Sequence, residues 1–524
     1  MKDIKEIISE LLAKHILIEK DKIKNLIEIP PDQKLGDYAF PCFSLAKDFK
    51  KSPISIATEL AVEISDQLPK EISEIKAING YLNFFIDKKI FFKDTVLKIL
   101  NEKENYGKIK ERKREKIMVE FSQANTHKAF HVGHIRGTSL GESISRILEF
   151  SGNKVIRANY QGDTGMHVAK WLWCYKRFHF NEKLREDESW IASIYVEAVK
   201  KLAENPQLQI EVDEINKKLT EGNDKEIMSL WKKTREFSLN SLEKIYKDLI
   251  THFDKYFFES EIEKRGKEIA EGLLKEGFAK ISDGATIIDL KQYNLGVLVL
   301  LRKDGTVLYS AKDLALAEKK FEIKGLTKSL SVIGSAQSFY TAQLSKILEL
   351  TKFPYAKDYI FLHFSEVRLP TGKMSSRTGE NILYSDFKRE IINYAKEEIK
   401  KRFPKIGVKE LEKRSLSISI AAIKYAMLKQ DPNKVIIFNK EEALNFEGNS
   451  GPYLQYSYAR ANSIIKKSKT KPSEKFEIIS LHEKEIQLVK KLAEFPEVVE
   501  HSKRQLNPAL IANYSFQLSK IFNE

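Results

Sequence analysis

The sequence predicts an α/β protein with a doubly wound parallel sheet, an α+β domain before it and an α-helical bundle after it. A β-branched and aromatic run at 117–121 leads through a polar loop into a helical pattern, which indicates a strand–loop–helix unit. Further strand patterns alternate with helical segments, as in parallel sheets; they lie at 285–290, 296–302, 330–335 and 358–364. After residue 408 strand patterns nearly vanish, which favours a helical bundle.

Changes in composition divide the chain. Residues 1–100 mix helical patterns with short apolar strands, and the Lys-rich stretch 101–116 is interpreted as a linker. The sheet domain is expected at 117–407, interrupted at about 175–290 by a charged, aromatic and helical insertion. Residues 408–524 are the expected helical bundle.

The composition is that of a soluble globular protein, with 42% hydrophobic and 31% charged residues. No apolar run approaches the ~20 residues that span a bilayer, so no membrane partner is expected. Two cysteines exclude a disulfide scaffold and fit a reducing cytoplasm, where we expect the protein to act. A net charge of +15 favours a nucleic-acid partner, although solvated Lys-rich helix faces would also explain it.

Two histidines lie at the junction between the first loop and its helix. The expected helix N-terminus carries unpaired N–H groups and a partial positive charge, which suit a bound anion. His131 and His134 are at this point, and Gly133 between them would let a flat ligand such as a purine lie against the backbone. The alternative is an ordinary strand-to-helix turn, which any α/β protein contains.

A metal site at this junction is disfavoured. His127, His131 and His134 would need further ligands, but Cys42 and Cys174 are far away in sequence and no nearby carboxylate completes a set. The sequence therefore predicts no protein-bound metal.

A second polar segment, 370–381, reads PTGKMSSRTGEN. Lys373 and Arg377 supply cations, and Ser375 and Ser376 supply hydroxyl donors. Such a loop suits a triphosphate that gains charge as it reacts, and the alternative is a solvated surface loop.

HVGH at 131–134 and KMSS at 373–376 together resemble the signature pair of class I aminoacyl-tRNA synthetases, which have a Rossmann-like catalytic domain. More of the chain resembles the arginyl-tRNA synthetase family, and the matching blocks cover nearly its whole length. These blocks are the core motif at 119–165, the segments at 308–317, 332–337 and 447–464, and an N-terminal-domain motif at 34–47.

The resemblance implies an arginine–tRNA ligase. Such an enzyme activates L-arginine with ATP to arginyl-adenylate and pyrophosphate, then transfers arginine to the 3′ end of tRNA(Arg). The implied partners are tRNA(Arg), L-arginine and ATP, with Mg²⁺ accompanying ATP, and the expected state is a monomer. Residues 1–100 would form an additional tRNA-binding domain, and 408–524 the anticodon-binding domain.

An arginine pocket needs carboxylates and carbonyls, because a guanidinium is planar, permanently charged and offers five donors. Asp313 would pair with the guanidinium, and Tyr309 lies on the same helical face. The alternative for Asp313 is a surface carboxylate paired with Lys312 or Lys319. The full set that the resemblance implies is Glu120, Ser122, Asn125, Tyr309, Asp313 and Gln337.

The chemistry needs positioning and charge stabilisation without a covalent enzyme intermediate. The implied catalytic residues are His131, His134, Lys373, Ser375 and Ser376, the last three acting on the departing pyrophosphate. The implied ATP-binding residues are Lys128, His131, Gly133, His134, Gly334, Lys373 and Met374.

Tyr453, Tyr456 and Arg460 are candidates for tRNA contact, with core packing as the alternative for the tyrosines. The chain departs from the family pattern at Tyr340, where His is expected, and at its end, which we interpret as a C-terminal truncation. Two alternatives therefore stay open. One is a class I synthetase for another amino acid, such as lysine. The other is a tRNA-binding protein whose charging activity is impaired.

Overall fold

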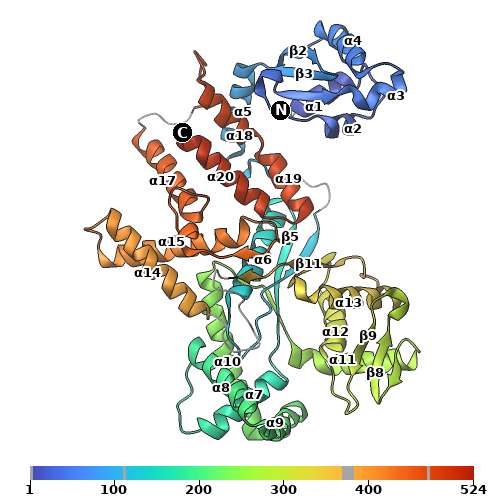
Figure 1. Cartoon of the computed structure of the whole chain (residues 1–524), viewed down its shortest axis with the longest axis vertical. Helices are drawn as coiled ribbons and strands as arrows, with labels where there is room; N and C mark the ends of the chain where they lie inside the picture. The colour runs from blue at the N-terminus through green and yellow to red at the C-terminus, as the bar shows by residue number, and fades with distance from the viewer. Residues whose placement is uncertain (1–3, 110–113, 369–382, 469–472) are drawn as a thin grey trace. The chain divides into compact units, whose positions relative to one another are not determined.

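The computed structural model describes residues 4–109, 114–368, 383–468 and 473–524. The chain divides into two compact units (Figure 1). Unit 1 combines the residues up to 107 with 464–496 and 520–524, and unit 2 contains 108–463 and 497–519. Within the described residues, no helix is both long and apolar enough to cross a membrane.

Unit 1 has a three-stranded antiparallel sheet in the order β1-β3-β2, in agreement with the predicted α+β domain. Phe40 and Leu82 are register partners in this sheet, and both are fully buried. Helix α4 packs on the sheet, and its first turn is capped by Ser52, which accepts from the Ser55 N–H. Unit 1 also includes α18, which lies in the stretch assigned above to the helical bundle. The elements are β1 (Tyr38–Pro41), β2 (Ile72–Ile78), β3 (Tyr81–Ile86), α1 (Ile4–Leu12), α2 (Lys20–Leu26), α3 (Ala46–Phe49), α4 (Pro53–Ser65), α5 (Lys88–Glu102) and α18 (Glu483–Ala493).

Unit 2 contains the predicted parallel sheet, with five strands in the order β11-β10-β4-β5-β6. Every neighbouring pair is parallel, and central strand β4 is flanked by β10 and β5. Strand order reverses between β4 and β10, so a crevice forms at the carboxyl ends of these two strands. The strands are β4 (Lys116–Glu120), β5 (Lys154–Gln161), β6 (Lys255–Phe258), β10 (Lys328–Gly334) and β11 (Tyr359–Phe364).

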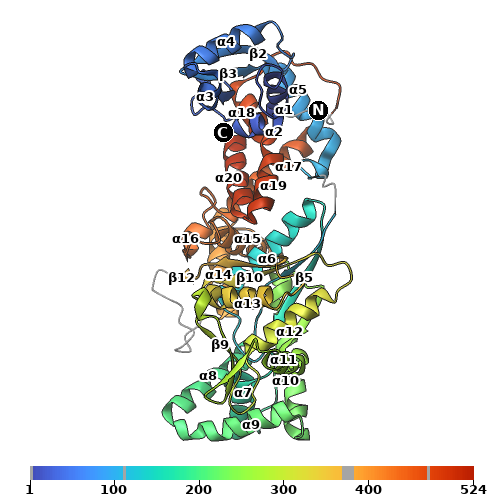
Figure 2. The ribbon, with the colours of Figure 1, turned by 90° about the vertical axis from the view of Figure 1, so that its right-hand side faces the viewer.

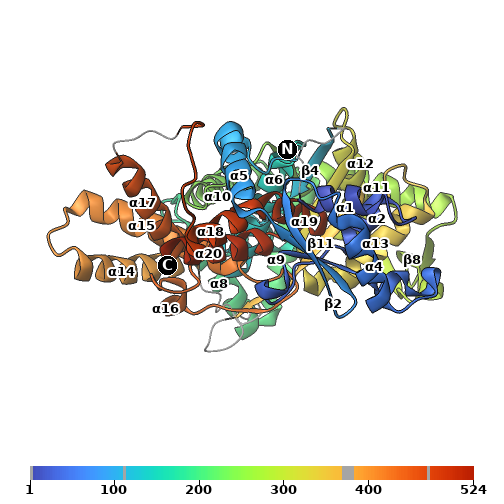
Figure 3. The same ribbon diagram turned by 90° about the horizontal axis from the view of Figure 1, so that it is seen from above.

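Helices connect these strands and extend from them. The four helices between β5 and β6 pack on one another (Figures 1 and 2). Their shared core contains the buried Trp171. In the last part of unit 2, α14 and α15 lie side by side (Figure 3). The helices are α6 (Val132–Phe150), α7 (Met166–Phe178), α8 (Glu188–Glu204), α9 (Gln209–Glu221), α10 (Lys225–Asp248), α11 (Glu259–Lys275), α12 (Tyr309–Phe321), α13 (Ser338–Leu350), α14 (Tyr384–Arg402), α15 (Val408–Leu428), α16 (Lys440–Ala443), α17 (Gly451–Lys467), α19 (Phe495–Gln505) and α20 (Ala509–Asn523).

The strand patterns at 285–290 and 296–302 were predicted for the parallel sheet, and this prediction is wrong. They form β8 (Ala285–Asp289) and β9 (Val297–Leu301) in a separate antiparallel sheet, where β8 pairs with β9 on one side and with β7 (Lys280–Ser282) on the other. Parallel neighbours need a crossover of a dozen or more residues, whereas β7 and β8 are joined by Asp283 and Gly284 alone. Both residues have positive φ, of 50° and 81°, which suits a two-residue hairpin turn.

Helix α6 approaches β4 closely at Gly141. A Cβ atom there would lie 2.0 Å from the Cγ atom of the buried Phe121. The absence of a side chain at Gly141 therefore allows α6 to lie this close to the loop that follows β4.

We expect Gly141→Ala to destabilise unit 2 by about 1–3 kcal/mol, because the added methyl group overpacks this contact. Gly272→Ala on α11 is the matched control: nothing lies within 4 Å of its Cβ position, so helix propensity should leave stability equal or higher. Urea unfolding followed by tryptophan fluorescence measures both, since all four tryptophans belong to unit 2. Equal stability of the two variants would contradict the close approach.

Candidate active site

The loop after β4 is held in a strained conformation. Ser122, Gln123 and His127 have positive φ values of 78°, 46° and 60°, which side chains other than glycine rarely adopt. Ser122 Oγ donates to the Tyr246 hydroxyl at 3.2 Å, and the His127 N–H donates to Ser238 Oγ at 2.9 Å. These contacts with α10 hold the loop at the carboxyl edge of the sheet.

His131 and His134 cap the start of α6. His131 Nδ1 accepts from the Gly133 N–H, and His134 Nδ1 accepts from the His131 N–H, each at 3.2 Å. The two ring centroids are 3.9 Å apart. Because both Nδ1 atoms accept, each neutral ring carries its proton on Nε2 and offers a donor there.

Both imidazoles are neutral at physiological pH. Burial, helped by the positive charge of Lys128, lowers the pKa of His131 to about 4. Burial also holds the pKa of His134 well below its usual value. Lys128 lies 5.3 Å from the centre of the Tyr195 ring, and burial and Lys170 lower its pKa. This edge of the sheet therefore combines N–H donors with a cation.

Glu120, the last residue of β4, is buried in an ion pair. Its Oε2 atom lies 2.8 Å from Lys320 Nζ, and its Oε1 atom accepts from Gln123 Nε2 at 3.1 Å. Asn125 lies against the next strand end, where its Oδ1 atom is 2.4 Å from the position that a Cβ at Gly162 would take.

Asp313 is a second carboxylate of the same crevice. Tyr340 donates to its Oδ2 atom at 2.6 Å, and the rings of Tyr340 and Tyr309 meet edge to face at 4.8 Å. Burial raises the pKa of Asp313 to about 7, against the hydrogen bond from Tyr340. The alternative pairing does not form, because Lys312 lies beside Glu259 and Glu263, and Lys319 beside Glu322, leaving Asp313 without either lysine.

The other predicted residues fall into three groups. Gly334 ends β10, with open space at its Cβ position, and Gln337 ends the short 3-10 turn before α13. On α17, Tyr453 packs against Phe516 at 5.6 Å while Tyr456 and Arg460 are exposed, so these three do not join the crevice. The predicted residues of the KMSS segment lie outside the described residues; they are Lys373, Met374, Ser375 and Ser376.

Sequence reasoning missed two residues of this site. Lys320 and Tyr340 contact its two carboxylates, yet neither was predicted to do so. For Lys320 a signal was present: it follows Asp313 by seven residues, or two helical turns, on a predicted helix.

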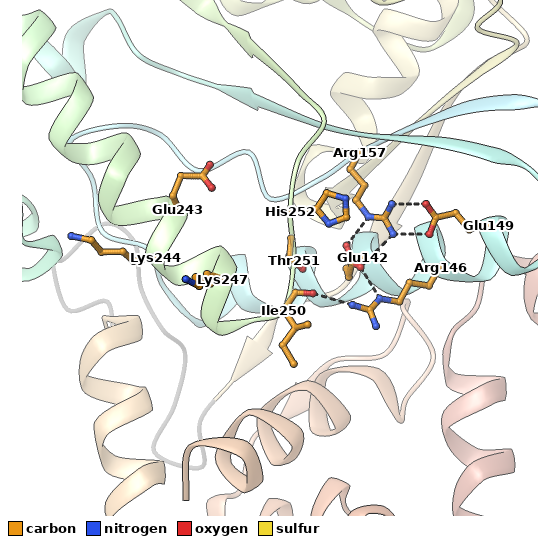
Figure 4. A pocket seen from close by; sticks show the side chains of 10 residues that line it. All are labelled: Glu142, Arg146, Glu149, Arg157, Glu243, Lys244, Lys247, Ile250, Thr251 and His252. Carbon is orange, nitrogen blue, oxygen red and sulfur yellow. Dashed lines mark hydrogen bonds and ion pairs between the residues drawn. The ribbon is translucent and has the colours of Figure 1, made fainter. Parts of the chain in front are cut away.

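A cavity of about 860 Å³ lies at the opposite end of α6 from the histidines (Figure 4). Arg157 lies between Glu142 and Glu149, at N–O distances of 2.9 and 2.7 Å, and Arg146 also pairs with Glu142. Within the described residues, its lining contains no predicted site residue. We attribute these side chains to an ion-pair network that anchors α6 to β5.

One cluster in the described part of the chain has ligand atoms close enough for a metal ion. Cys174, His179 and Glu197 offer such atoms within 4.8 Å of one another. His179 also lies between Glu182 and Glu197, at 2.6 and 2.9 Å. Burial lowers the pKa of His179, but the two carboxylates outweigh it and the net pKa is raised. An imidazole paired with two carboxylates accounts for this cluster without a metal.

Comparisons with known proteins agree with this geometry. The model described as tRNA synthetases class I (R), catalytic domain, matches residues 95–439. The Arginyl tRNA synthetase N terminal domain model matches 2–86, and the DALR anticodon binding domain model matches 454–524.

Relatives and solved structures give the same result. The arginine–tRNA ligase of Clostridium perfringens is 35% identical over 100% of this chain and 92% of its own length. That of Treponema denticola is 36% identical over 95% of this chain and 87% of its own. The Thermus thermophilus arginyl-tRNA synthetase structure has a TM-score of 0.79 at 26% identity, covering 99% of this chain and 90% of that chain.

The parallel sheet, the paired histidines after its central strand and the catalytic-domain match define a class I aminoacyl-tRNA synthetase. The matches of all three domain models, together with the full-length relatives, identify the family within this class. The chain belongs to the arginyl-tRNA synthetase family.

The pKa of His131 can be tested directly. We expect its ring signal, in NMR spectra of histidine-labelled protein, to stay constant from pH 8 to 5.5 and to titrate only near pH 4. His179 is the internal control and should titrate above pH 6.5, since its pKa is raised. The variants His131→Gln and His179→Gln assign the two signals. A His131 midpoint near 6.5 would show that its ring is not held neutral by burial.

Proposed function

We propose that this chain ligates arginine to tRNA(Arg) through the crevice between β4 and β10. The main support is the half-buried carboxylate of Asp313, which lies without a cationic side-chain partner at hydrogen-bond distance among the described residues. A permanently charged guanidinium supplies that partner, and its planar fork matches a carboxylate in two parallel hydrogen bonds.

The arginine site follows from this pairing. Asp313 binds the guanidinium beside Tyr309, and Gln337 accepts from the substrate. Glu120, Ser122 and Asn125, from the strained loop and its strand, hold the α-amino and carboxylate end. Because a bound cation favours the charged form of a neighbouring carboxyl group, arginine binding ionises Asp313 fully.

ATP occupies the adjacent part of the edge and brings Mg²⁺ with it as part of the substrate. The arginine carboxylate attacks the α-phosphorus, a P–O bond forms, and the bond to the bridging oxygen breaks as pyrophosphate leaves. Neutral His131 and His134 donate hydrogen bonds from Nε2–H to phosphate oxygens, and Lys128 adds a cation. Gly133 and Gly334 leave room for adenosine. Lys373, Met374, Ser375 and Ser376 are proposed to assist from their sequence motif alone.

The remaining parts are proposed to bind tRNA. Residues 1–100 act as the additional tRNA-binding domain, joined by the linker 101–116 to the catalytic domain at 117–407 with its insertion. Residues 408–524 bind the anticodon, with Tyr453, Tyr456 and Arg460 on the helix that contacts RNA. The net charge of +15 supports a polyanionic partner. We propose a cytoplasmic monomer.

Arginine-dependent exchange of pyrophosphate into ATP, with and without tRNA, tests the proposal. The wild type should support exchange with arginine but not with citrulline or lysine, and Asp313→Ala should lower kcat/KM for arginine at least about 100-fold, as for a lost buried charge pair. Tyr355→Phe, on a ring stacked with Phe321 at 4.2 Å, is the control and should behave as wild type. Exchange with lysine would support a different synthetase. Binding of tRNA without exchange would support the binding-protein alternative.

Tyr340→Phe should change how arginine affinity depends on pH. The hydrogen bond from Tyr340 lowers the pKa of Asp313, so its loss raises that pKa from about 7, and ionised Asp313 then requires higher pH. We expect KM for arginine to rise several-fold at pH 7 and to return toward the wild-type value by pH 9. A rise by the same factor at every pH would instead mean that Tyr340 contacts arginine without acting through Asp313.

A further inference from the structure

Lys320 is a buried cation to which the proposed reaction assigns no role. It lies on α12 and is 0% exposed, and its Nζ atom is 2.8 Å from Glu120 Oε2. It also donates to the Tyr359 hydroxyl at 3.0 Å and to Ser331 Oγ at 3.2 Å. Two of the three ammonium N–H donors are therefore used by neutral hydroxyl groups, while Glu120 Oε2 lies at ion-pair distance.

The partners come from three adjacent strands of the sheet. Glu120 ends β4, Ser331 is its register neighbour on β10, and Tyr359 begins β11. Lys320 therefore spans the strands on both sides of the point where the strand order reverses. Burial lowers the pKa of Lys320, but Glu120 and Tyr359 outweigh it and the net pKa is raised, so the side chain stays charged.

This contact fixes the carboxylate that faces the substrate site. One oxygen of Glu120 is paired with Lys320, and the other accepts from Gln123 in the strained loop. Without the ammonium, Glu120 would be a buried carboxylate with no cation, and its neutral form would become favoured. Other titratable groups face this cluster from neighbouring elements: Asp313, Tyr160, Tyr340, Tyr359 and Glu259.

We propose that Lys320 is a positioning residue of the arginine site, which holds Glu120 as an oriented carboxylate and offsets its charge. The inference rests on the proposed function of this pocket. With Lys320 and both carboxylates ionised, the three side chains sum to a charge of minus one. Arginine, with two cationic groups and one carboxylate, has a charge of plus one. Without Lys320, the two carboxylates alone would sum to minus two, so the ammonium halves the negative charge that they place at the arginine site.

The test measures KM and kcat for amino-acid-dependent exchange in Lys320→Met, Lys320→Arg, Glu120→Gln and the double variant Lys320→Met/Glu120→Gln. Lys320→Met should raise KM for arginine about tenfold at pH 7, the size expected when a charge-assisted contact is lost, and KM should fall as pH rises. The KM for ATP should stay the same, and Lys320→Arg should restore KM to within about threefold.

The double variant separates positioning from a general structural effect. If Lys320 acts through Glu120, adding Lys320→Met to Glu120→Gln should change KM by less than about twofold. Effects that multiply, or a Lys320→Met effect on kcat and both KM values alike, would overturn the proposal. Lys424→Met, which removes a half-buried ammonium that donates to the Leu249 carbonyl at 2.8 Å, is the control for loss of a lysine that is hydrogen-bonded inside unit 2.

If Lys320→Met folds poorly, Tyr359→Phe removes one hydrogen-bond partner at nearly constant volume and should raise KM about threefold, an effect that Glu120→Gln abolishes. The series is run with whichever amino acid the wild type activates. Exchange with lysine would refute the proposed function, yet a Glu120-dependent effect of Lys320→Met on that KM would still support the positioning role.

Discussion

The position of α6, which carries both histidines, depends on one buried guanidinium. Arg136 is fully buried and donates to the carbonyl groups of Ser365, Glu366, Asp431, Pro432 and Lys434, with N–O distances of 2.7 to 3.3 Å. Burial lowers its pKa to about 10, so it stays charged at neutral pH, and the carbonyl oxygens replace the carboxylate that a buried arginine usually needs. Two segments about 230 and 295 residues away in sequence are thereby attached to the first turns of α6.

A fixed helix gives its N-terminus a defined chemistry. His131 and His134 use their Nδ1 atoms to satisfy N–H groups of the first turn, which a serine or aspartate cap does in other helices. The same contacts select the Nε2–H tautomer, and burial keeps both rings neutral. A cap made of histidines therefore leaves oriented, uncharged N–H donors at the carboxyl edge of the sheet. In the proposed reaction these donors face phosphate oxygens that gain charge, so helix capping and the proposed catalysis use the same two side chains.

The sequence predicted what depends on local pattern. The apolar run at 117–121 and the helical period after Gly133 identified β4 and α6, and the motif placed two histidines between them. Partners far apart in sequence could not be predicted, because periodicity does not say which strands meet. The strands at 285–301 have the composition of parallel strands but pair antiparallel. Lys320 and Glu120 are 200 residues apart, and only the fold brings them to 2.8 Å.

The two carboxylates of the crevice differ because their partners differ. Glu120 has a cation at 2.8 Å, whereas Asp313 has a neutral hydroxyl donor at 2.6 Å and a pKa of about 7. In the empty pocket at neutral pH, Asp313 is therefore partly protonated, which lowers the cost of burying a second negative charge. A cationic ligand reverses that preference and releases a proton. Partial protonation of Asp313 thus limits what the two carboxylates cost the stability of the free protein. Under the proposed function, affinity for the guanidinium group of arginine should rise with pH as Asp313 ionises.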